Sequence, residues 1–183
     1  LSMQEELARV LPLIRALAGR LRIPISIDTY KADVARAAID AGASIVNDVS
    51  GLRRDPALAR VVAERGAGLV LMHSRGTPKT MAGDAVYGDL VADVVTEISS
   101  SVRAAEAAGV AAEQIVVDPG VGFAKRPAHS YGVLARLPEI AAALGRPLLV
   151  GPSRKSFMRV ALNDRPAVER KIDYRQLLRR KPP

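Results

Sequence analysis

The 183-residue sequence predicts an α/β fold organised around a parallel β-sheet. Short β-branched apolar runs alternate with helix-patterned segments, and successive runs lie about 20 to 45 residues apart. Each run also ends in a polar cluster, and the carboxyl ends of parallel strands meet at one edge of a sheet. Since a TIM (β/α)8 barrel usually needs roughly 250 residues, the sequence predicts an incomplete barrel of about five β/α units.

Five strands are predicted from apolar runs in which β-branched residues are frequent. They occupy residues 23–27, 44–46, 68–72, 115–117 and 147–150. A helical segment precedes all of them, so the chain is expected to open with a helix that has no strand before it. Relative to a complete barrel, we expect two units to be missing at the front and most of one at the back.

Five helices are predicted from alanine-rich segments or from apolar side chains that recur on one helical face. They occupy residues 5–20, 33–40, 55–65, 90–108 and 131–144. Asp55 and Pro56 are typical of an N-cap followed by proline in the first turn. Gly42 and Gly109 end the helices before them, and residues 74–88 form a long polar loop.

Composition narrows the classes of function. The chain has no cysteine, which excludes disulfides and thiolate metal sites. The two histidines, His73 and His129, are far apart, and no spacing resembles a zinc or iron site. No apolar run approaches the roughly 20 residues of a membrane span. We therefore expect a cytoplasmic protein with no membrane partner.

The net charge of +8 is concentrated at the carboxyl end of the sequence. Residues 165–183 hold seven Lys or Arg against two acids. We divide the chain into a barrel domain over residues 1–170 and a basic tail over residues 171–183. The chain has only four tyrosines, two phenylalanines and no tryptophan, so no surface with interleaved basic and aromatic residues supports nucleic-acid binding.

Polar side chains follow every predicted strand. In chain order they are Asp28, Asn47, His73 after Met72, Asp118 and Lys155. Any one of the acidic or amide residues could simply cap the next helix, but five strand ends in one register favour a shared site. A carboxylate accepts two N–H groups, an amide donates and accepts, and a lysine meets a ring carbonyl. The set therefore suits a flat heterocycle with neighbouring donors and acceptors.

Four blocks of the sequence resemble bacterial dihydropteroate synthase, a branch of the pterin-binding enzymes. They are PISIDTYKADVARAAIDAGASIVNDVSG (24–51), LMHSRGTPKTM (71–81), VDPGVGFAKRPAHSYGVL (117–134) and PLLVGPSRKSFM (147–158). The likeness runs from about residue 5 to residue 170. It implies a TIM-barrel transferase of folate biosynthesis and a sulfonamide target. The implied reaction condenses 6-hydroxymethyl-7,8-dihydropterin diphosphate with p-aminobenzoate to give 7,8-dihydropteroate and pyrophosphate.

The resemblance also implies roles for individual residues. The implied pterin pocket consists of Asp28, Asn47, Val49, Met72, Asp118, Gly151 and Lys155. The implied p-aminobenzoate pocket consists of Phe123, Lys155 and Ser156. Asp28 and Lys155 are the implied catalytic residues, and His73 is expected to orient the loop that follows it.

Some expected features of the family are not found in the sequence. The family's loops for Mg²⁺ and diphosphate, and its last-strand Arg-Val-His motif, are absent, so Mg²⁺ is implied without a metal ligand in the chain. The chain is then either a truncated product or part of a longer protein whose other residues are not in this sequence, and the sequence leaves both alternatives open. A homodimer is implied by the resemblance. A non-catalytic pterin-binding module and a methyltetrahydrofolate-dependent methyltransferase remain alternatives.

Overall fold

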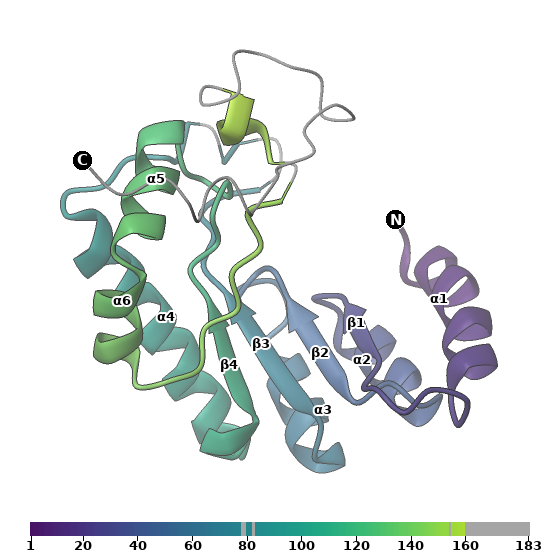
Figure 1. The fold of residues 1–183 in the computed structure, drawn as a ribbon. Helices are drawn as coiled ribbons and strands as arrows, with labels where there is room; N and C mark the ends of the chain where they lie inside the picture. The colour runs from purple at the N-terminus through teal and green to yellow at the C-terminus, as the bar shows by residue number, and fades with distance from the viewer. Residues whose placement is uncertain (78–79, 82, 154, 160–183) are drawn as a thin grey trace.

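A computed structural model describes residues 1–77, 80–81, 83–153 and 155–159 of the chain (Figure 1). Four parallel strands form one sheet whose spatial order follows the chain. The strands are β1 (Ser26–Asp28), β2 (Ile45–Asp48), β3 (Gly68–Met72) and β4 (Ile115–Asp118). Sequential parallel strands joined through helices are the arrangement of a β/α barrel, so the predicted fold class is confirmed. Residues 171–183, the predicted basic tail, lie outside the described residues.

Helices connect the strands and were largely predicted. They are α1 (Met3–Leu17), α2 (Ala32–Asp40), α3 (Ala57–Arg65), α4 (Leu90–Ala107), α5 (Pro127–Ala135) and α6 (Leu137–Leu144), with short 3-10 turns η1 (Ala112–Gln114) and η2 (Ser156–Arg159). In α1 the Ser2 side chain and the Glu5 carboxylate form a capping box. Among the described residues, no helix is both long and apolar enough to cross a membrane.

The single helix predicted over residues 131–144 is wrong. The structure has two helices that meet at Arg136, whose backbone lies at φ −113° and ψ 20°. Pro138 stands in the first turn of α6. Proline has no N–H to donate to the preceding turn and disfavours a helical residue before it, so the first helix ends and a second one starts.

The fifth predicted strand, over residues 147–150, is reduced to one parallel bridge between Leu148 and Val117 of β4. The Val117 N–H donates to the Pro147 carbonyl at 3.0 Å, and the Leu149 N–H donates to the Val117 carbonyl at 2.9 Å. Pro147 and Pro152 lack the N–H that a longer ladder requires. The segment therefore runs beside β4 with little regular pairing.

The two faces of the sheet have different surroundings. Helices α2, α3 and α4 lie against one face (Figure 1) and bury alternate strand residues such as Ile27, Val46 and Val117. Because strand side chains alternate between faces, the neighbours of these residues point to the opposite face. Along β1 the pattern is exposed, buried, exposed, with Asp28 at the exposed end. The strand-end polar groups thus lie on the face that these helices leave uncovered.

Candidate functional site

The strand register brings the predicted polar residues into two levels. Asp28 of β1 lies directly opposite Asn47 of β2, and the Asn47 side-chain amide donates to the Asp28 carboxylate at 3.1 Å. Two residues further along the strands, Met72 of β3 lies opposite Asp118 of β4. The structure therefore joins these four side chains along one edge of the sheet.

Both carboxyl groups at this edge are partly removed from water. Burial raises the pKa of Asp118, which is 6% exposed, while the Gly120 N–H at 2.7 Å and the Lys155 ammonium oppose that rise. Burial also raises the pKa of Asp28, and the bond from Asn47 opposes it. Donors that approach a desolvated carboxylate stabilise its charged form. Both positions are therefore suited to a ligand that presents N–H groups.

The loop after β4 has a tightly constrained backbone. Gly120, Gly122 and Ala124 all have positive φ angles, of 66°, 81° and 45°. A Cβ atom on Gly120 would overlap the carbonyl oxygen of His73, so only glycine fits there. The loop therefore lies directly on the end of β3, and its shape depends on that contact.

Lys155 and Phe123, predicted to share the p-aminobenzoate pocket, lie together. The Lys155 ammonium is 4.5 Å from the centroid of the Phe123 ring, within the range of a cation–π contact, and it donates to the Val121 carbonyl. Burial lowers the pKa of Lys155 and the charge of Asp118 opposes that effect. Ser156 begins η2 and is exposed, as is Gly151.

A cavity of about 380 Å³ lies between the loops that follow β1, β2, β3 and β4. Val49 and Phe123 are the two members of the predicted site that line it. Its other lining residues are Tyr30, Ser50, Arg53, Arg54, Ser74, Gly76, Thr77 and Met81. The cavity joins the predicted p-aminobenzoate side to a wall that contains two arginines.

A buried polar cluster beneath the loops was not predicted. The Lys125 ammonium lies 2.7 Å from Nδ1 of His73, and both side chains are buried, at 8% and 3% exposure. Burial lowers the pKa of Lys125 to about 7. Burial, reinforced by the nearby Lys125 charge, lowers the pKa of His73 to about 2. His73 is therefore a neutral ring at neutral pH, and its Nδ1 accepts from Lys125.

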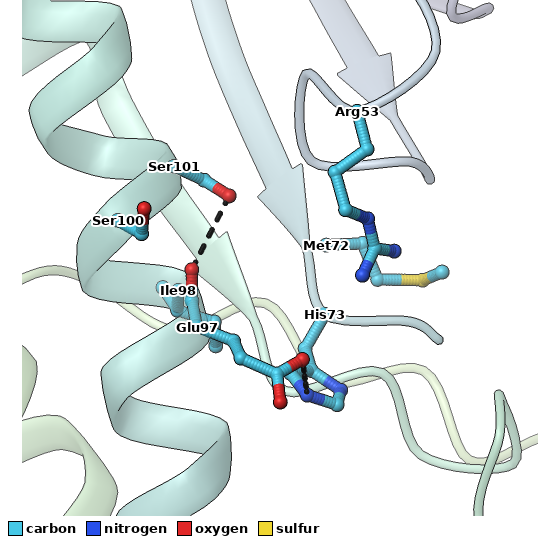
Figure 2. Close-up of a pocket in the computed structure, with 7 residues that line it drawn as sticks. All are labelled: Arg53, Met72, His73, Glu97, Ile98, Ser100 and Ser101. Carbon is cyan, nitrogen blue, oxygen red and sulfur yellow. Dashed lines mark hydrogen bonds and ion pairs between the residues drawn. The ribbon is translucent and has the colours of Figure 1, made fainter. Parts of the chain in front are cut away.

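Glu97 of α4 completes this cluster. Figure 2 shows its side chain directed at the His73 ring, with Oε2 3.1 Å from Nε2. Glu97 and His73 line a second cavity, of about 160 Å³, and Arg53 and Met72 line it from the opposite side (Figure 2). Lys125 stands in the DPGVGFAK block, but a lysine in a loop is ordinarily solvated. Only its position in that block was a signal.

Comparison with known proteins identifies the family of the chain. A family model described as pterin binding enzyme matches residues 1–176. A dihydropteroate synthase of Synechocystis sp. is 50% identical over 157 residues, which are 86% of this chain and 54% of that protein. The chain thus spans about half the length of the curated relatives it matches.

Solved structures agree with this assignment. The dihydropteroate synthase from Stenotrophomonas maltophilia, with imidazole in its active site, superposes with a TM-score of 0.87 at 42% identity, over 92% of this chain and 63% of that one. The enzyme from Xanthomonas albilineans in complex with 7,8-dihydropteroate gives 0.83 at 36% identity, over 92% and 60% of the two chains. From its sequence and its partial barrel, this chain belongs to the family of pterin-binding enzymes.

Proposed function

We propose that the chain is the pterin-binding portion of a dihydropteroate synthase. The reaction joins p-aminobenzoate to the methylene carbon of 6-hydroxymethyl-7,8-dihydropterin diphosphate and releases pyrophosphate. The observation that carries the proposal is the position of Lys155, whose ammonium lies over Phe123 and is electrostatically coupled to Asp118. One cation then borders both the site for a heterocycle and the site for an aryl ring.

The pterin ring binds along the strand ends. Asp118 accepts N–H groups from the 2-amino and N3 edge, Asn47 meets the opposite ring edge, and Lys155 meets the O4 and N5 side. Carboxylates and amides at fixed positions recognise such an edge through paired hydrogen bonds. The remaining pocket residues, which contribute wall surface, are Val49, Met72 and Gly151.

Catalysis in this proposal depends on orientation and fixed charge. As the bond to diphosphate breaks, Asp28 stabilises the positive charge that develops on the dihydropterin. Phe123, Lys155 and Ser156 hold p-aminobenzoate so that its amine attacks the methylene carbon and then loses a proton. No covalent enzyme intermediate is required, because positioning and preorganised electrostatics lower the barrier.

The resemblance also implies Mg²⁺, and the residues present do not match it. Within the described ranges, no group of three or more His, Cys, Asp or Glu side chains gathers in a way that could hold a metal ion. The proposal therefore derives no step through a metal. A cytoplasmic location and a homodimer likewise stay predictions from the resemblance.

The relatives support the substrates. The Xanthomonas albilineans enzyme binds 7,8-dihydropteroate, a molecule that contains both the pterin and the p-aminobenzoate moieties. That superposition covers 92% of this chain. A second candidate is a non-catalytic pterin-binding module, in which Asp28, Asn47, Asp118 and Lys155 hold a pterin without turnover.

Calorimetry distinguishes the two candidates. A dihydropterin is titrated into the chain with and without its diphosphate, each in the presence and absence of Mg²⁺. A preference for the diphosphate that requires Mg²⁺ supports the synthase, whereas equal affinity for both ligands supports the binding module. If neither the dihydropterin nor its diphosphate binds, both candidate functions are contradicted. Asp118→Asn serves as the matched variant because it keeps the shape of the side chain and removes its charge.

A further inference from the structure

Three side chains, two from distant parts of the sequence and one from the loop itself, donate hydrogen bonds to the backbone of the loop after β4. Lys155 donates to the Val121 carbonyl, and the Tyr87 hydroxyl donates to the Ala124 carbonyl at 2.8 Å. Lys125 donates to the Phe123 carbonyl at 3.3 Å. Each donor therefore fixes one peptide group in a segment that lines the p-aminobenzoate side of the cavity.

Lys125 also bonds to the framework of the sheet. Its ammonium reaches Nδ1 of the His73 ring, and the backbone N–H of His73 donates to the backbone carbonyl of Asp118 at 2.8 Å. Two acceptors, one on the strand end and one on the loop, are thus bridged by a single buried cation. A lysine ammonium has three donors on a compact centre, which suits this bridge better than a planar guanidinium.

The surroundings of this ammonium are mixed in charge. Asp118 and Glu97 stabilise its charged form, while Arg75 and Lys155 oppose it. The Tyr87 ring centroid lies 5.8 Å away. Burying a charged group is costly unless it is hydrogen-bonded, and the acceptors on His73 and Phe123 offset that cost only while the loop keeps this position.

We propose that Lys125 is a positioning residue that sets the Phe123 ring, and with it the aryl-substrate side of the site, by tying the Phe123 carbonyl to His73. The assignment of p-aminobenzoate as the aryl substrate rests on the proposed function. The bridge itself depends only on contacts within the chain. Lys125 touches no substrate, so its effect is transmitted through the loop.

The experiment uses the two phenylalanines of the chain as reporters. The full chain is labelled with 4-fluorophenylalanine, which places one fluorine on Phe123 and one on Phe157. Phe157 is 3% exposed and packs in an apolar cluster that includes Val121 of the same loop, so it reports how far a disturbance of the loop spreads. In Lys125→Met, we expect the Phe123 resonance to move toward the solvent-exposed value and broaden, and to change more than the Phe157 resonance.

A neighbouring substitution provides the control. Arg126 is exposed, and Arg126→Met removes the same charge from the adjacent position without breaking the bridge, so both resonances should match the wild type. If Lys125→Met does not fold, His73→Leu removes the acceptor at the other end of the same hydrogen bond without adding a phenylalanine, and should release Phe123 in the same way. An unchanged Phe123 resonance in a folded variant of either kind overturns the proposal.

Binding measurements separate this proposal from the proposed function. We expect Lys125→Met to weaken p-aminobenzoate binding by roughly tenfold, because a misplaced wall loses orientation, with pterin affinity changed by less than about threefold. If the wild type binds neither ligand but Phe123 responds as expected, the proposed function fails and the positioning role stands. If the wild type binds both and the two affinities fall together in Lys125→Met, the positioning role fails.

Discussion

Replacement of Lys125 by methionine should change how the stability of the chain depends on pH. Burial lowers the pKa of this lysine from 10.5 to about 7. Between these values the unfolded chain carries a proton on Lys125 that the folded chain does not, so unfolding takes up a proton and stability rises with pH. Each pH unit in this window contributes up to about 1.4 kcal/mol. Between pH 7.5 and 9.5 the wild type should gain about 2–2.5 kcal/mol from this residue.

Urea unfolding at pH 7.5, 8.5 and 9.5 measures this gain. Lys125→Met has no ammonium to titrate, so its free energy of unfolding should lack the rise. Histidines do not obscure the result, since this range lies above their ordinary pKa. Arg126→Met should keep the wild-type slope because Arg126 is exposed. Parallel pH profiles for wild type and Lys125→Met would refute the argument that the buried Lys125 side chain is largely a neutral amine at high pH.

Three further outcomes are expected. Asp118→Asn should reduce pterin affinity, measured by calorimetry, more than tenfold through loss of a charge-assisted bond. Its free energy of unfolding in urea should be equal to or higher than that of the wild type, because burial raises the pKa of this carboxyl. A fall in both the affinity and the free energy of unfolding would contradict this prediction. Gly120→Ala should cost at least about 3 kcal/mol or prevent folding, since the new Cβ overlaps the His73 carbonyl. Gly145→Ala, with φ of 57° and no atom within 4 Å of the added Cβ, should cost only about 1 kcal/mol, and similar losses would contradict the steric account. Lys155→Ala should weaken pterin binding roughly ten- to hundredfold and Lys155→Arg should not restore it fully; wild-type affinity in Lys155→Ala would remove Lys155 from the site.

The strand ends could be predicted because they depend on local pattern. β-branched runs that stop at Asp28, Asn47 and Asp118 mark both the strands and the edge where their polar groups gather. The register then places Asp28 beside Asn47 without further information. These parts of the fold and the site follow from period and order alone.

Features that depend on tertiary contacts were missed. The burial of Lys125 is stabilised by His73, which is 52 residues away in the chain, and nothing near Lys125 in the sequence indicates that partner. The break between α5 and α6 was foreseeable from Pro138, but the apolar spacing on both sides resembled one continuous helix. The short pairing at Leu148 depends on which backbone N–H groups reach β4.

The offset between the two levels of the strand register limits the orientations in which a ligand can contact both levels. Asp118 stands two residues beyond the level of Asn47, which is about 6–7 Å along the strand direction. A flat ligand that contacts both must therefore lie aslant the strands rather than parallel to the sheet edge. In the proposed function, the two-ring pterin reaches across this offset and across the two strand spacings, of about 4.8 Å each, that separate β2 from β4. We therefore expect single-ring analogues with the same donors to bind more weakly than a pterin.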